Sequence, residues 1–167
     1  MNRETHIHPF DPVCDALCRV LVLGTFPSVK SRENAFYYGH PQNRFWRVVS
    51  AVFEEPLPQS IPQKRAMLLR HHIALWDVIA SCDIAGSSDA SIRNAVPNDL
   101  PALLRESRID CILLNGKTAE RIYLKYWKDL SVPHLCLPST SPANAACGLD
   151  ALITAWRKAL TGEDTAL

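Results

Sequence analysis

Four short apolar runs that alternate with helical segments constrain the fold of this chain more than any other feature of its sequence. The runs are Val20 to Leu23, Ile73 to Ala80, Ile109 to Leu114 and His134 to Leu137. Apolar spacing and capping residues predict helices from Gln42 or Asn43 to about Phe53, Pro62 to His71, Asn98 or Asp99 to about Glu106, Lys117 to about Tyr126, and about Leu149 to Leu160. Such alternation is typical of a mainly parallel sheet with helices on both faces. We therefore expect an α/β fold in three layers, α/β/α, around a four-stranded parallel sheet.

The length of the chain fits one domain. Its 167 residues have room for a hydrophobic core, so we expect a single domain over residues 1–167. Residues 1–18 are interpreted as an arm, flexible over about 1–12, that leads to a short helix. His6 and His8 alternate in this arm and are interpreted as incidental. The polar stretch 83–99 is expected to be a loop, and residues 161–167 are expected to fray.

Composition and missing motifs narrow the function. No apolar run is long enough to span a membrane, and the first residues lack the apolar centre of a signal peptide, which favours the cytoplasm. The six cysteines fit that compartment as reduced thiols, and their spacing lacks the paired pattern of a metal site. The glycine-rich fingerprints of nucleotide binding and the GxSxG elbow are also missing. We expect neither a metal nor a cofactor.

Charge is unevenly distributed although the net charge is only +1. Between Lys30 and Arg47 there are four basic residues and one acidic residue, which favours contact with phosphate. A second basic stretch at 64–72 is explained equally well by contact with an anionic partner and by a solvated helix face.

Polar side chains follow all four expected strands. Thr25 and Ser28 follow the first, Asp77 lies in or near the end of the second, Asn115 ends the third, and residues 139–144 follow the fourth. The carboxyl ends of parallel strands share one edge of the sheet, so these groups are expected to meet in one crevice. Amides, hydroxyls and aromatic rings suit a flat polar ring, and they could hold a water for hydrolysis.

These residues lie in motifs that resemble the uracil-DNA glycosylase superfamily, and within it the hypoxanthine-DNA, or DNA-deoxyinosine, glycosylases. The motifs are GTFPSVKS (24–31), YYGHPQNRFW (37–46), LWDVIASC (75–82), GSSDASIRNAVPND (86–99), LLNGKTA (113–119) and PSTSPANA (138–145). They span roughly residues 20–146. The HPxNRFW segment is also similar to mismatch-specific uracil glycosylases.

The resemblance implies a monofunctional DNA glycosylase that hydrolyses the N-glycosidic bond of a deaminated base flipped from DNA. Hypoxanthine is the favoured base, and uracil or xanthine is an alternative. The implied partner is DNA, with no membrane and a monomeric chain. Rival interpretations are a uracil or G/T-mismatch glycosylase, a catalytically silent module that binds nucleic acid or nucleobase, and a hydrolase of small nucleosides.

Two departures from the family pattern shift the expected catalytic group. Many members carry Asp or Asn in the loop after the first strand, where this chain has Thr25 or Phe26, and many carry a histidine where this chain has Leu137. In the resembled branch the catalytic asparagine comes from the HPxN segment, which implies Asn43 as the residue that positions the water. The alternative for Asn43 is a helix cap.

The resemblance also assigns the remaining site residues. Tyr38 is the expected stacking ring, with Tyr37 as alternative, and His40 contacts the base or holds its loop. Asn115 is expected to recognise the base edge, and Asp77 either bonds the base or holds a neighbouring loop. The other expected substrate contacts are Thr25, Phe26 and Pro27, and the expected phosphate contacts are Ser28, Ser31, Ser139, Thr140, Ser141 and Asn144. Asp89, Asn98 and Asp99 are expected to hold their own loop.

Overall fold

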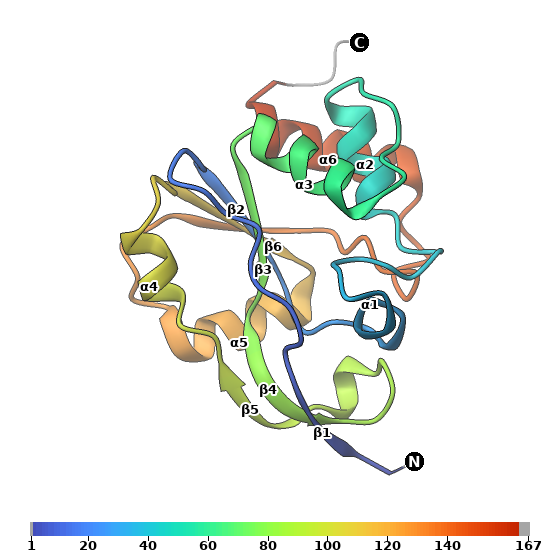
Figure 1. Cartoon of the computed structure of the whole chain (residues 1–167), viewed down its shortest axis with the longest axis vertical. Helices are drawn as coiled ribbons and strands as arrows, with labels where there is room; N and C mark the ends of the chain where they lie inside the picture. Colours follow the sequence, from blue (N-terminus) through green and yellow to red (C-terminus); the bar gives the residue numbers. More distant parts are fainter. Residues whose placement is uncertain (1, 164–167) are drawn as a thin grey trace.

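The computed structural model describes residues 2–163, and its centre is a four-stranded parallel sheet in the order β3-β2-β6-β7. The strands are β2 (Val20–Gly24), β3 (Ile73–Asp77), β6 (Cys111–Asn115) and β7 (His134–Leu137). The helices are α1 (Val29–Asn34), α2 (Phe45–Val52), α3 (Ile61–Arg70), α4 (Leu100–Arg105), α5 (Lys117–Trp127) and α6 (Leu149–Thr161). In Figure 1, α2, α3 and α6 lie on one side of this sheet, and α4 and α5 lie on the other. The three-layer α/β/α prediction is confirmed.

Two hydrophobic cores follow from the alternation of side chains along the strands. On β2, Val22 packs among residues of α2, α3 and α6. Its neighbours Leu21 and Leu23 point to the other face and pack against residues of α4 and α5. Both faces of the sheet are therefore buried, which leaves the ends of the strands as the places where polar side chains can reach solvent.

Helix starts agree with the capping residues in the sequence. Ser60 accepts a hydrogen bond from the backbone of Gln63 at the start of α3, and Asp99 does the same for Ala102 at the start of α4. Between residues 2 and 163, none of the helices is both long and apolar enough to cross a membrane.

The strand predicted from Ile73 to Ala80 is instead two strands. β3 ends at Asp77, and β4 (Ile79–Ile84) leaves the parallel sheet to form a second, antiparallel sheet in the order β1-β4-β5. The chain turns where the Val78 and Ile79 N–H groups bond the carbonyls of Gly24 and Thr25. Apolar residues continue through this turn, so the pattern contained no break. β5 (Arg93–Pro97) occupies part of the stretch predicted as a loop.

The expectation of a flexible N-terminal arm is also corrected. β1 (Glu4–Ile7) pairs antiparallel with β4, and Val13 forms an isolated bridge with Leu75. Residues 13–18 form a bridge and a turn in place of the expected short helix. At the other end, α6 reaches Thr161 and Gly162 caps it with a left-handed conformation. The rest of the predicted frayed tail, 164–167, lies outside the described residues.

Candidate active site

The carboxyl ends of the parallel strands border one cavity of about 1070 Å³. Strand register places Gly24 beside Asp77, and Asn115 beside Leu137, at this edge of the sheet. The lining comes from segments at 24–31, 37–43, 87–90, 115–118 and 136–147, together with Asp77. This volume is at the upper end of the range for small-molecule sites. The structure thus brings the polar groups of all four strand ends to one place.

Gly24 allows two polar side chains to lie over the end of β2. A Cβ atom at this position would lie 2.5 Å from Asp77 Oδ1 and 3.0 Å from the Tyr38 hydroxyl. Any larger residue would displace the carboxylate or the phenol. The glycine is therefore a requirement of the site's geometry.

A chain of hydrogen bonds links three of the lining segments. The Asn115 amide donates to the hydroxyls of Tyr38, at 3.1 Å, and Thr140, at 3.0 Å. The Thr140 backbone N–H donates to Asn115 Oδ1, and the Thr140 hydroxyl lies 3.0 Å from Asn43 Oδ1. The same Asn43 oxygen accepts from the backbone N–H of Phe45 at 2.9 Å, at the start of α2. The segment before α2 is thereby fixed to the ends of β6 and β7.

The backbone N–H groups at the two ends of this series of hydrogen bonds determine where its hydrogens lie. Backbone N–H groups only donate, so the atoms facing Phe45 N–H and Thr140 N–H are the amide oxygens of Asn43 and Asn115. Asn115 then donates to Thr140, and Thr140 donates its own proton to Asn43 Oδ1. That oxygen accepts two hydrogen bonds, whereas the nitrogen of Asn43 has no acceptor within residues 2–163. Asn43 therefore presents amide N–H groups to the cavity.

Asn115, which the sequence assigned to the base edge, is largely engaged by the protein. Both of its N–H groups bond hydroxyls, and its oxygen accepts from Thr140. A lone pair on Oδ1 is left for a base. The geometry gives Asn115 a clear role in positioning Tyr38, and its predicted base contact stays a prediction.

Tyr38 is held in a strained conformation at the cavity wall. Its φ of 53° lies in the left-handed region, which a bulky residue occupies at a cost of order 1–3 kcal/mol. Its ring stacks on Phe45 with centroids 4.3 Å apart, and burial raises the pKa of its hydroxyl well above the usual range. Since Phe45 covers one face and Tyr38 lines the cavity, the other face is available to a planar base.

Asp77 is buried and paired with a histidine from the N-terminal segment. His8 Nε2 lies 2.8 Å from Asp77 Oδ2, and the two side chains are 5% and 6% exposed. The other carboxylate oxygen, Oδ1, lies over Gly24 at the cavity. His8 was interpreted as incidental, and the alternation of His6 and His8 contained no sign of a partner about 70 positions away. Only the unexpected strand β1 explains how it reaches the site.

Asp89 is a second carboxyl group in this cavity, although the sequence suggested that it holds its own loop. Burial and the nearby charge of Asp77 raise its pKa to about 6, while a hydrogen bond from Thr25 acts in the opposite direction. It lies in the short 3-10 helix Asp89–Ser91, which follows β4. The signal that could have found it is the concentration of Ser and Asp at 87–89, directly after an apolar run.

We expect Asp89→Asn to stabilise the fold in a pH-dependent way. Below about pH 4 the carboxyl is protonated in both the folded and the unfolded chain, so the substitution has little effect. As pH rises from about 4 to about 6, the unfolded carboxyl ionises while the folded one still holds its proton, so the folded state loses stability; the amide removes that loss, a gain of about 1–2 kcal/mol above pH 6. Urea unfolding at pH 4 and pH 8 measures the difference, with the exposed Asp129→Asn as control. Equal effects at both pH values would contradict this assignment.

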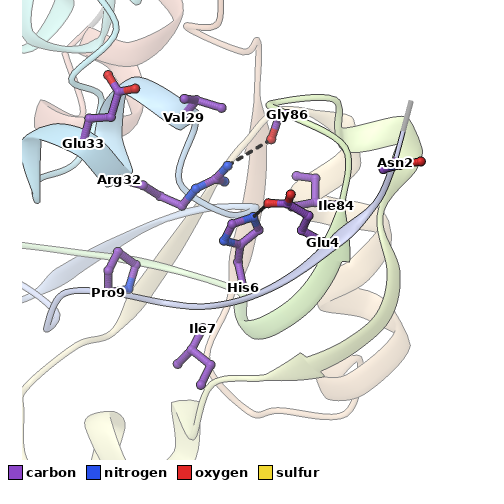
Figure 2. Close-up of a pocket in the computed structure, with 10 residues that line it drawn as sticks. All are labelled: Asn2, Glu4, His6, Ile7, Pro9, Val29, Arg32, Glu33, Ile84 and Gly86. Atoms are coloured by element: carbon purple, nitrogen blue, oxygen red, sulfur yellow. Dashed lines mark hydrogen bonds and ion pairs between the residues drawn. The ribbon is translucent and has the colours of Figure 1, made fainter.

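Two of the four basic residues predicted to favour phosphate, Arg32 and Arg44, hold loops of the site. Arg32 donates to the carbonyls of Pro27 and Gly86, and Arg44 donates to those of Ser141, Asn144 and Cys147. Figure 2 shows Arg32 reaching Gly86 beside a second, more open hollow of about 600 Å³ between β1 and α1. These contacts make the loop conformations depend on guanidinium groups and not on a bound anion.

The predicted phosphate contacts divide by exposure. Thr140 and Ser31 are 0% and 2% exposed, and the Ser31 hydroxyl accepts the Gly39 N–H in the loop of Tyr38, so both hold the site together. The hydroxyls of Ser139 and Ser141 accept backbone N–H groups, which leaves their protons for a phosphate. Ser28 and Asn144 also line the cavity, and these four residues carry the prediction of phosphate contact.

Three further predicted substrate contacts also line the cavity: Phe26, Pro27 and His40. His40 Nδ1 accepts the backbone N–H of Gln42 at 3.1 Å, so its Nε2 carries the hydrogen. Phe26 is 8% exposed, and its ring lies 5.8 Å from the Arg32 guanidinium. His40 therefore combines the loop role with a free donor.

The fold and the site define a class of α/β protein with a cavity lined by polar and aromatic side chains at the carboxyl edge of a parallel sheet. A family model described as the uracil DNA glycosylase superfamily matches residues 12–160. The chain belongs to this superfamily, which confirms the resemblance found in its motifs.

Individual relatives agree with this assignment. A hypoxanthine DNA glycosylase from Methanosarcina acetivorans is 34% identical over 137 residues, covering 81% of this chain and 86% of the relative. One from Methanosarcina barkeri is 34% identical over 110 residues, covering 65% and 70%. A solution NMR structure of a candidate uracil DNA glycosylase from Methanosarcina acetivorans matches with a TM-score of 0.81 at 29% identity, covering 94% of this chain and 98% of that one.

Proposed function

We propose that this protein is a DNA glycosylase that removes deaminated bases, with hypoxanthine as the preferred base. Membership of the superfamily and the names of the two relatives support the reaction class. The observation that carries the preference for deaminated bases over adenine and cytosine is Asp77, a buried carboxylate with one oxygen at the cavity. The choice of hypoxanthine among the deaminated bases rests on the names of the relatives.

A fixed carboxylate distinguishes hypoxanthine and uracil from their parents adenine and cytosine, although it does not distinguish xanthine from guanine, whose N1 also carries a hydrogen. Hypoxanthine and xanthine at N1, and uracil at N3, carry a ring N–H beside a carbonyl, whereas adenine N1 and cytosine N3 are acceptors. A carboxylate only accepts hydrogen bonds, so Asp77 Oδ1 pairs with the N–H of a deaminated base and opposes the lone pair of adenine or cytosine. The free face of Tyr38 would stack on the same base.

Hydrolysis requires a positioned water and stabilisation of the departing base. We assign the water to Asn43, whose free amide N–H groups can hold the water oxygen while a lone pair faces C1′ of the sugar. The residues that line the cavity include neither a serine beside a histidine base nor a metal-binding set among the described residues. A monofunctional hydrolysis without covalent intermediate suits this set of groups.

The DNA strand would lie across the rim of the cavity. Ser139, Ser141 and Asn144 supply donors for phosphates around an extruded nucleotide, while the Ser28 hydroxyl is engaged with Ser31. Flipping is required because a base in a stacked duplex cannot enter a cavity at the end of a sheet. We propose that one chain suffices, since all groups assigned to the reaction come from it.

Single-turnover cleavage of oligonucleotides tests the proposal. We expect abasic sites at hypoxanthine first, slower release of uracil and xanthine, and no release of adenine. Uracil released fastest would favour the rival uracil glycosylase. Absence of cleavage at every base would favour the binding module, and hydrolysis of free inosine without salt-sensitive DNA binding would favour a nucleoside hydrolase.

A further inference from the structure

The N-terminal segment contributes a side chain to the site from outside the region that the family model matches. That region begins at residue 12, and His8 lies before it. β1 holds this segment against β4, and the His8 backbone N–H bonds the carbonyl of Ala80 at 2.7 Å. His8 is thereby fixed in place directly after β1 and not on a mobile arm.

The surroundings of the His8 ring determine which of its nitrogens is paired. Nε2 faces Asp77 Oδ2 at 2.8 Å, and because a carboxylate only accepts, Nε2 is the donor. Nδ1 is buried and has no partner within residues 2–163, among the rings of Phe10, Phe26 and Tyr37 at centroid distances of 4.8 to 6.0 Å. The hydrogen-bonding capacity of His8 is therefore directed at Asp77.

We propose that His8 is a positioning residue for base recognition: it holds Asp77 Oδ2 so that Oδ1 points into the cavity as an acceptor. This inference rests on the proposed function. The main chain is held independently here, since the Asn98 side-chain amide donates to the Asp77 carbonyl at 2.8 Å. Within residues 2–163, the Asp77 carboxylate has no hydrogen-bond donor other than His8. Its orientation therefore depends on this one bond.

The consequence is a link between the first strand and substrate choice. A carboxylate that is free to rotate can turn Oδ1 away from the base, and a displacement of about 1 Å in a positioned group can cost on the order of 100-fold in rate. Loss of the His8 bond would lower the rate on hypoxanthine more than it lowers DNA binding.

The matched variants are His8→Gln and His8→Asn. A glutamine amide can place its nitrogen where Nε2 lies, whereas the shorter asparagine cannot reach Asp77. We expect His8→Asn to lower single-turnover kcat/KM on hypoxanthine DNA by about 10- to 100-fold. His8→Gln should stay within about 5-fold of wild type. His6→Gln is the control, because His6 lies two residues earlier, on β1, and faces Glu4 and the second hollow (Figure 2).

Non-additivity separates positioning from simple damage to the fold. In an Asp77→Ala background, His8→Asn should cause no further loss of rate, and thermal unfolding checks that both proteins fold. Equal losses in His8→Gln and His8→Asn, or an undiminished loss in the Asp77→Ala background, would overturn the proposal. Wild type inactive on every base would instead overturn the proposed function, and His8→Asn as active as wild type would overturn only this inference.

Discussion

Asn43→Asp is expected to abolish base excision while leaving the fold intact. An aspartate retains an oxygen for the two donors that Asn43 already accepts, the Phe45 N–H and the Thr140 hydroxyl. It loses the amide N–H groups that we assign to the water. We expect at least about a 100-fold loss in single-turnover rate on hypoxanthine DNA, a magnitude typical of removing one catalytic donor.

Asn43→Ala supplies the comparison. It removes the same donors and also the oxygen that accepts the Phe45 N–H at the start of α2, so it should lose as much activity as Asn43→Asp and about 1 kcal/mol of unfolding free energy in addition. Chemical denaturation and cleavage of the same oligonucleotides measure the two effects. An aspartate variant that excises as fast as wild type, or faster, would contradict the donor role of Asn43. It would show that the side-chain oxygen of residue 43 acts as a general base on the water.

The strand ends of the site were predictable from sequence for a physical reason. Asn115 ends an apolar run and Asp77 lies within another, and the alternation of these runs with helices requires parallel strands, which place their carboxyl ends together. The spacing of apolar residues and the capping residues are local properties of the sequence, so β7 and the starts of α3 and α4 were also predictable. The contacts of a side chain beyond the end of its strand depend on residues that are near in space but distant in sequence, so they were not.

The unpredicted features all depend on contacts between distant segments. The amide orientation of Asn43 follows from a hydrogen-bonded chain that includes Thr140, 97 residues away. His8 joins the site only because β1 pairs with β4. The side chains of β1 are mostly exposed, so the sequence has no apolar pattern from which this strand could be predicted. Asp89 looks like an ordinary loop residue until burial beside Asp77 is seen.

Asp77→Asn has the second largest expected effect, because it reverses the hydrogen-bonding character of the site without changing its shape. The His8 N–H would bond the new amide at its oxygen, which turns the amide N–H groups toward the cavity. These donors would oppose the ring N–H of hypoxanthine. A buried donor facing a donor costs about 1–3 kcal/mol or more, so we expect a loss of about 10- to 1000-fold on hypoxanthine DNA.

Adenine makes this prediction specific. Its N1 is an acceptor and would match the amide donors of the variant, so the preference for hypoxanthine over adenine in binding to the extruded base should shrink more than any other property. Single-turnover rates and competition between oligonucleotides carrying each base measure this preference, and Asp129→Asn repeats the charge change at an exposed position. An undiminished preference would show that the base is recognised elsewhere. If His8 holds the Asp77 carboxylate, the preference for hypoxanthine over adenine should be lost in both Asp77→Asn and His8→Asn. It should be kept in His8→Gln, whose amide can replace the Nε2 donor.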